Sequence, residues 1–348
     1  MSGLLPNVAV VNPLRNSGWN QMLLSCGQGT IFHSSNWAQL LADSYGYHPA
    51  YFLLSEPGAF GGCLPVMEVD SMLTGRRGVC LSFSDFCGSL VAGGDEFRLL
   101  FESVLGLGRM SGWRYVEFRG EQFLNRESPA KVFAHHILEL SRDERLMHSR
   151  LRASNARNIR KAMKEGVTIE TTETLQGVQD FYRLHCLTRK RHGVPPQPCT
   201  FFRKLHEHVI SKGFGFTALA RHNQVPVAGV ICLHFGTSAV YKYGASDVRF
   251  QHLRANNLVL WEAIKRCAQC GFQSFSLGRT DLHDEGLLAF KDGWGGVRSV
   301  INYYRYDFAT SQFVHQSDRD GEAFRDLFRK LPVNVLTMLG KLAYRHMG

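Results

Sequence analysis

Six lysine and arginine residues fall between Arg150 and Lys164, and no acidic residue occurs there before Glu165. Helical spacing would gather most of this charge on one face and apolar side chains on the other. The expected basic face consists of Arg150, Arg157, Lys161 and Lys164, with Arg160 at its edge. Such a face suits phosphates of RNA, of a nucleotide sugar or of a lipid carrier. An ordinary solvated helix is the alternative, and Arg152 falls toward the apolar side.

A second group of reactive side chains lies in the segment LGRTDLHDEGLLAFKDGWGG at 277–296. It follows an expected strand, and sites in α/β sheets gather at the carboxyl ends of strands. Asp281 or His283 could take a proton from an amine. Lys291, between an aromatic residue and a Trp-Gly-Gly turn, could stabilise an oxyanion or contact phosphate. A surface lysine and a solvated acidic loop are the alternatives, and the spacing fits no metal-ligand pattern, so no metal is predicted.

The segment YGASDVRFQHLRANNL at 243–258 lacks the glycine turn that acetyl-CoA enzymes usually carry between a strand and a helix. Asn256 and Asn257 stand at the expected helix start, where free amide groups can bind an anion. Capping of the helix by Asn256 is the alternative. Gly106, Gly108 and Gly112 end a helix instead of opening one, which argues against a dinucleotide fold. No GxxxxGK[ST] or GxSxG motif occurs.

The composition is that of a globular protein, and its positive net charge favours acidic partners. The 348 residues carry a net charge of +10, with 44% hydrophobic and 20% charged residues, and their number predicts two domains. The first residues do not resemble a signal peptide, and no apolar run approaches the ~18 residues of a membrane span. Nine scattered cysteines in apolar contexts indicate reduced, buried thiols. These features predict a cytoplasmic protein, and peripheral association with the inner face of the membrane is the further option.

Helical and extended patterns alternate along both halves of the chain, which predicts an α/β (α+β) fold with mixed central sheets flanked by helices. The first domain is expected at 1–145 and the second at 146–308. The expected helices are 34–45, 97–110, 175–191, 201–211, 258–270 and 322–345, the last interrupted near Pro332. The expected strands are 51–54, 62–69, 79–82, 113–118, 135–140, 167–171, 214–221, 225–235, 239–246, 272–277 and 300–306.

An ordered set of segments resembles the Fem-type peptidoglycan aminoacyltransferases, and most of all their FemAB-like or BioF2-like relatives. After the basic helix come RHGVPPQPCTFF, YKYGAS, NNLVLWEAI, FSLGR and FKDGWGG, so the resemblance is best over about 150–307. It implies two tandem acetyltransferase (GNAT-like) domains, with helices at 309–348 returning to the first. It also implies an enzyme that joins an activated acyl or aminoacyl group to an amine of a cell-envelope or exopolysaccharide-related precursor.

The resemblance assigns roles to particular residues. Lys291 matches the family's lysine that handles the tRNA terminus or the tetrahedral intermediate, and the basic helix matches through Arg157, Arg160, Lys161 and Lys164. Tyr243, Arg279 and Trp294 are further expected substrate-binding residues. Two positions that are basic in cell-wall members are Gln39 and Gln197 here, which argues against a nucleotide-linked muropeptide.

The basic helix and the family resemblance together predict partners that carry phosphate. No tightly bound cofactor is expected, and the acyl donor is a co-substrate, either aminoacyl-tRNA or acyl-CoA. The acceptor is a phosphate-bearing small molecule or lipid-linked precursor, with tRNA and the membrane surface as further partners and no DNA. Two alternatives stay open: a CoA-dependent N-acetyltransferase, and a non-catalytic module that binds RNA or anionic lipid. For the latter, residues 327–348 mix apolar and basic side chains as interfacial helices do.

Overall fold

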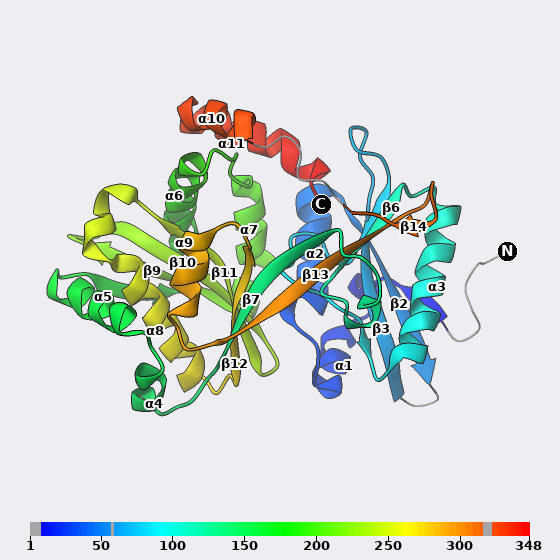
Figure 1. Cartoon of the computed structure of the whole chain (residues 1–348), viewed down its shortest axis with the longest axis horizontal. Helices are drawn as coiled ribbons and strands as arrows, with labels where there is room; N and C mark the ends of the chain where they lie inside the picture. The colour runs from blue at the N-terminus through cyan, green and yellow to red at the C-terminus, as the bar shows by residue number, and fades with distance from the viewer. Residues whose placement is uncertain (1–7, 57–58, 316–321) are drawn as a thin grey trace. The chain divides into compact units, whose positions relative to one another are not determined.

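The computed structural model describes residues 8–56, 59–315 and 322–348, and the chain divides into two compact units (Figure 1). The first unit consists of Met1–Phe133, Val300–Ser317 and Tyr344–Gly348; the second consists of Ala134–Ser299 and Asp318–Ala343. This division differs from the expected domains at 1–145 and 146–308. The first boundary falls at 133, the longer segment of the second unit ends at Ser299, and of the expected returning segment 309–348 only residues 309–317 and Tyr344–Gly348 belong to the first unit.

The first unit is built on a mixed sheet in the order β1-β2-β3-β4-β6-β13. β4 and β6 are parallel, whereas the pairs β1–β2, β2–β3, β3–β4 and β6–β13 are antiparallel. β5 and β14 pair antiparallel with β3 and β13. Its strands are β1 (Val8–Val11), β2 (His48–Glu56), β3 (Ala59–Val69), β4 (Arg77–Val79), β5 (Leu90–Val91), β6 (Tyr115–Arg119), β13 (Val297–Asp307) and β14 (Gln312–Phe313).

Helix α3 covers strands β1, β2 and β3 of this sheet, and the core of the unit lies between them. The helices of this unit are α1 (Trp19–Cys26), α2 (Ser35–Tyr45) and α3 (Gly94–Met110), with 3-10 turns at Pro13–Arg15, Ile31–His33, Gln122–Leu124 and Tyr344–His346. The Ser34 hydroxyl caps α2 by accepting a hydrogen bond from the Trp37 amide, as serine commonly does at a helix start.

The second unit has the strand order β7-β12-β11-β10-β9-β8. β11 and β12 are parallel, whereas the pairs β8–β9, β9–β10 and β10–β11 are antiparallel. Its strands are β7 (Lys131–Glu139), β8 (Thr168–Thr172), β9 (Gly215–His222), β10 (Val225–Phe235), β11 (Ser238–Ser246) and β12 (Ser274–Asp281). Its helices are α4 (Glu144–Ser149), α5 (Ala153–Lys164), α6 (Leu175–Arg191), α7 (Cys199–His208), α8 (Ala255–Gln269), α9 (Glu285–Asp292), α10 (Glu322–Lys330) and α11 (Val333–Ala343), with 3-10 turns at Ile210–Lys212 and Val248–Leu253.

Helices α6 and α8 cover opposite faces of this second sheet. Ala228 and Val230 of β10 belong to the core cluster that also contains most apolar residues of α8. Gly229 lies between them, and a methyl group added there would contact Phe181 of α6. Because neighbouring residues of a strand point to opposite faces, the two helices enclose β10 from both sides.

Helix α5 forms as its apolar spacing predicts, but it begins at Ala153. Arg150 is therefore not on the expected basic face; it ends α4, and its guanidinium donates to the Glu139 carbonyl at 3.2 Å. Gly166 follows α5 with φ +74°, the left-handed conformation that glycine adopts most readily.

The starts of helix α8 and of strand β4 also differ from expectation. Asn256 does not cap α8; the N-cap is Arg254, and the Asn256 amide donates to the Ser246 hydroxyl at 3.2 Å. The expected strand at 79–82 is the shorter β4, because the chain turns into positive φ at Leu81.

The nine cysteines are free thiols, and six of them are buried, so the expected reduced state agrees with their packing. None of the helices in the described part of the chain has the length and apolar character that a membrane-crossing segment needs.

Candidate functional site

The two parallel strands of the second unit separate before they end. β11 and β12 are in register from Ser238 and Ser274 to Val240 and Ser276. Beyond this short pairing both strands continue, β11 to Ser246 and β12 to Asp281. The backbone of the diverging segments therefore lies without a neighbouring strand on that side, at the carboxyl ends where α/β sites gather.

Lys291 reaches the diverging part of β12. Its ammonium group donates to the carbonyl of Gly278 at 3.0 Å and to that of Arg279 at 3.1 Å, and the side chain is only 3% exposed. Helix α9 starts directly after β12, with the Asp284 carboxylate accepting from the Leu287 amide. The last turn of this short helix therefore returns Lys291 to the strand that precedes it.

A pocket of about 360 Å³ lies beside the diverging strands, within the second unit. It is lined by the N-terminal ends of α5 and α8, by the segment between β11 and α8, and by two residues of α9. The lining residues are Arg152, Ser154, Asn155, Asn158, Val227, Ala228, Ser246, Asp247, Phe250, Gln251, Arg254, Ala255, Asn256, Asn257, Ala289 and Phe290. Most of these side chains are polar, and the two basic ones among them are the arginines Arg152 and Arg254.

Two helix N-termini meet at this pocket, and both begin with an arginine. Arg152 is the N-cap of α5 and Arg254 is the N-cap of α8, and neither helix start has a side-chain cap hydrogen bond. A helix N-terminus carries about half a positive charge, and its first amide groups point away from the helix. Two such termini and two guanidinium groups together favour an anionic ligand such as phosphate.

The backbone of Arg254 is unusual for its residue type. Its φ of +59° and ψ of +26° place it in the left-handed region, which side chains other than glycine and asparagine seldom adopt. The turn Val248–Leu253 that precedes it directs the chain into α8 in this conformation. Strained backbone of this kind is concentrated at ligand sites.

Asn155 supplies a buried amide to the pocket. The side chain is 6% exposed, and its Oδ1 accepts a hydrogen bond from Asn257 Nδ2 at 3.3 Å. Among the residues that the structure describes, no hydrogen-bond partner lies against Asn155 Nδ2. Since a buried donor without a partner costs about 1–3 kcal/mol, a ligand atom is a natural acceptor for it.

The pocket contains one carboxylate among its described lining residues, and that carboxylate is neutralised. Asp247 accepts hydrogen bonds from the guanidinium of Arg249 through both of its oxygens, at 2.6 to 3.1 Å. These bonds hold the pKa of Asp247 below its usual value, against the opposing effect of partial burial. The pocket as a whole therefore keeps its positive character.

The expected catalytic residues lie near one another in sequence and differ in exposure. Asp281 and His283 are exposed on the turn after β12, where the Asp281 carboxylate accepts from the His283 amide at 3.0 Å. Arg279 is exposed, and its carbonyl accepts a hydrogen bond from the Lys291 ammonium group. None of these four residues lines the pocket, although Ala289 and Phe290 directly precede Lys291.

The expected substrate-binding residues are in three places. The basic side chains of α5 are all exposed: Arg157, Arg160, Lys161 and Lys164. Trp294 is buried against Phe290, with ring centroids 5.7 Å apart. Tyr243 lies in an aromatic cluster with Phe202 and His185. None of these residues lines the pocket either.

Sequence reasoning missed the two arginines that do line it. Arg152 interrupts the apolar face of the predicted helix, and this break in the pattern was the one sign in the sequence that Arg152 has a special position. Its side chain donates to the Ala289 carbonyl at 3.3 Å, which links α5 to α9. Asn256 and Asn257, considered in the sequence as an anion-binding helix start with capping as the alternative, both line the pocket. Arg254 gave no signal, because its place at the pocket depends on a backbone conformation that no motif encodes.

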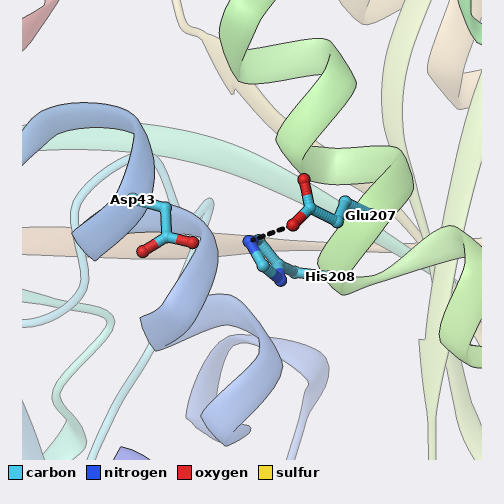
Figure 2. Close-up of side chains that lie close together, drawn as sticks. All are labelled: Asp43, Glu207 and His208. Carbon is cyan, nitrogen blue, oxygen red and sulfur yellow. Dashed lines mark ion pairs between the residues drawn. The ribbon is translucent and has the colours of Figure 1, made fainter.

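Glu207 and His208 form a separate pair of potential metal ligands in the second unit, at the end of α7. His208 Nε2 lies 3.7 Å from Glu207 Oε1 (Figure 2). Asp43, drawn in the same view, belongs to the first unit, where its carboxylate accepts from Gln39 Nε2 at 2.8 Å. A carboxylate and a neighbouring imidazole are too few ligands to define a metal centre.

Comparison with known proteins finds similarity to acyltransferases over part of the chain. Residues 149–292 match the family model described as an acetyltransferase (GNAT) domain. Over 105 residues the chain is 28% identical to the lipid II:glycine glycyltransferase of Staphylococcus haemolyticus (strain JCSC1435). That stretch is 28% of this chain and 25% of the relative, so the match spans about a quarter of the relative's length.

Three solved structures have a similar fold at low sequence identity. FemX gives a TM-score of 0.67 at 13% identity, over 88% of this chain and 98% of that chain. A tandem GNAT protein from the clavulanic acid biosynthesis pathway gives 0.56 at 10% identity, over 86% and 98%. L-PGS from Bacillus licheniformis gives 0.53 at 12% identity, over 92% and 97%. The expected fold class, a mixed α/β fold of the tandem GNAT kind, is confirmed.

Proposed function

We propose that this chain transfers an activated acyl or aminoacyl group to an amine, because residues 149–292 match a GNAT acetyltransferase domain, part of the chain is similar to a lipid II:glycine glycyltransferase, and the fold is similar to that of FemX. The acceptor amine would belong to a cell-envelope or exopolysaccharide-related precursor. The pocket at the N-termini of α5 and α8 carries this proposal, because its arginines and helix ends are suited to the phosphates of an acyl donor.

The reaction needs few chemical groups. The amine nitrogen attacks the acyl carbonyl, the new C–N bond forms, and the ester or thioester bond to the donor breaks. The nitrogen loses a proton and the leaving oxygen or sulfur gains one, so a group that moves the proton and one that stabilises the oxyanion would suffice. We assign the proton to Asp281 or His283, which lie exposed after β12, and the oxyanion or donor phosphate to Lys291.

For the acceptor, we propose a molecule that bears phosphate. The exposed basic face of α5 consists of Arg157, Arg160, Lys161 and Lys164, and it continues from the end of α5 that lines the pocket. The relative from Staphylococcus haemolyticus is named for lipid II, which is consistent with a lipid-linked acceptor here. Exposed arginine and lysine side chains can bind such phosphates without a precisely shaped pocket.

For the donor, aminoacyl-tRNA is favoured over acyl-CoA. The segment before α8 lacks the glycine turn that acetyl-CoA enzymes usually carry, and Arg254 occupies the helix start instead. A longer polyanion could contact the pocket and the basic face of α5 together. Acyl-CoA remains the alternative donor.

Titration calorimetry with acetyl-CoA and with deacylated tRNA distinguishes the two donors. We expect tRNA to bind with an affinity that falls steeply with salt, because basic residues displace counterions. A variant with Arg157→Glu and Lys161→Glu should bind tRNA at least about tenfold more weakly. The matched control is Arg98→Glu with Arg109→Glu, two exposed arginines of α3, which should bind as the wild type does. Binding of acetyl-CoA alone would establish the alternative donor, and binding of neither would reject the donor pocket.

A further inference from the structure

Helix α11 presents an apolar face to solvent. Val335, Met338 and Leu342 are 37%, 59% and 62% exposed. Their spacing of three and four residues puts them on one side of the helix. The only charged residue among the eleven of α11 is Lys341. Exposed apolar side chains that gather on one face of a helix can form an interaction surface for a protein or a membrane.

The opposite side of α11 is packed, so the orientation of the exposed face is fixed. Leu336 is fully buried and Gly340 is buried. A methyl group added at Gly340 would collide with the carbonyl of Pro196, which shows how closely α11 lies on the segment after α6. The helix also contacts α6 itself, and Figure 1 shows α10 and α11 following one another beside α6. Rolling the helix to hide Met338 and Leu342 would expose Leu336 instead.

Basic residues accompany the apolar face. Residues 325–343 contain four basic side chains, all exposed, and one acidic side chain: Arg325, Arg329, Lys330 and Lys341 against Asp326. The acidic group is already paired, since Arg329 Nη1 lies 2.7 Å from Asp326 Oδ1. Leu327 of α10 adds a further apolar side chain that is 53% exposed.

We propose that the α11 face, formed by Val335, Met338 and Leu342, docks on the surface of an anionic lipid bilayer. Apolar side chains that enter the boundary of the acyl chains, with cations among the headgroups, are the two features that hold a surface helix on such a membrane. With eleven residues the helix is too short to cross a bilayer. A second copy of this chain would not be attracted by the basic residues, because it carries the same charge.

This inference goes beyond the proposed function. It would bring the GNAT domain to the plane in which a lipid-linked acceptor resides, but it depends on neither the donor pocket nor the chemistry. The test therefore uses vesicles that contain neither donor nor acceptor, and its failure would leave the proposed function untouched.

Vesicle co-sedimentation of the full chain tests the proposal. We expect binding to vesicles of phosphatidylglycerol and phosphatidylcholine, and little binding to phosphatidylcholine alone. Met338→Glu with Leu342→Glu should lower the bound fraction on anionic vesicles about tenfold, because both apolar contacts are replaced by repelled carboxylates. The matched control is Met110→Glu with Leu24→Glu, helical positions that are 64% and 50% exposed in the first unit, and it should bind as the wild type does.

Four results would overturn the proposal. The first is failure of the wild type to sediment with anionic vesicles, and the second is sedimentation of the α11 variant to the same extent as the control. The third is equal binding to neutral vesicles, because the basic residues would then have no role. Sedimentation velocity of the soluble protein completes the test: a dimer that the α11 variant abolishes would assign this face to a second copy instead.

Discussion

The ammonium group of Lys291 lies 3.0 Å from the carbonyl oxygen of Gly278, where β12 has already parted from β11. The lysine thus binds backbone that no longer has a neighbouring strand on that side. Gly278 has a φ of +69°, so the backbone itself is turned at this point. The same contact that supports the open end of the sheet holds a buried positive charge next to the place where the proposed reaction would occur.

Replacing Lys291 by methionine should destabilise the protein. The carbonyls of Gly278 and Arg279 would lose a buried donor, which costs about 1–3 kcal/mol in the free energy of unfolding. Urea denaturation monitored by circular dichroism measures this difference. Lys212→Met, at an exposed lysine of the same unit, is the control and should change the stability by less than about 0.5 kcal/mol. Equal stability of the two variants would show that the contact has no structural role.

Gly293→Ala should disturb the pocket through Asn155. The added methyl group would lie 2.7 Å from Asn155 Nδ2, so the buried amide must move. We expect a loss of about 1–3 kcal/mol in stability, as for other overpacked sites. Gly286→Ala provides a comparison within α9, since its methyl group would meet nothing closer than 3.8 Å. That change should instead stabilise by about 0.5–1 kcal/mol. Thermal or urea unfolding that ranks the two variants the other way would contradict the assigned geometry.

His185 should make stability fall in mild acid. Burial, with a smaller contribution from Arg189, lowers its pKa to about 3. In the unfolded chain the pKa is about 6.5, so between pH 7 and pH 5 the unfolded state takes up protons that the native state does not. The stability due to neutral His185 is complete above about pH 6.5 and decreases as the pH falls toward 3.

His185→Phe should remove this dependence. The aromatic neighbours Phe181 and Phe202 can accept the new ring. The loss of unfolding free energy between pH 7 and pH 5 should be smaller than in the wild type by about 2 kcal/mol. His283→Gln, at an exposed position, should leave the loss unchanged. If the two variants show the same pH dependence, His185 is protonated in the native state.

The fold could be predicted from the sequence wherever local signals and packing agree. Helix α6 has the expected bounds, Leu175–Arg191, because the Thr174 side chain caps its start and Gly193 with φ +65° follows its end. Strand β10 also agrees at both ends. Helix α9 was not predicted, since eight residues with an interior glycine form a helix here mainly through the contacts that place Lys291 on β12.

The candidate site was predictable only in part. The charge of α5 is visible in the sequence, and its exposed basic face formed as expected, without Arg150. The pocket, however, lies at the N-terminal end of α5 and not on that face. Its arginines act through a helix end and a left-handed backbone conformation, and both arise from the way α5, α8 and α9 meet in three dimensions.

The affinity of an Arg254→Gly variant for deacylated tRNA tests the donor pocket most directly. Glycine adopts the φ of +59° without strain, so the variant should fold normally and lose only the guanidinium group. Asn223→Gly makes the same kind of backbone change, at φ +49° on the turn between β9 and β10. Loss of a charge-assisted contact should weaken binding about tenfold to a hundredfold in Arg254→Gly and leave Asn223→Gly unchanged. Equal affinities for tRNA in the wild type and both variants would contradict the claim that this pocket holds the donor.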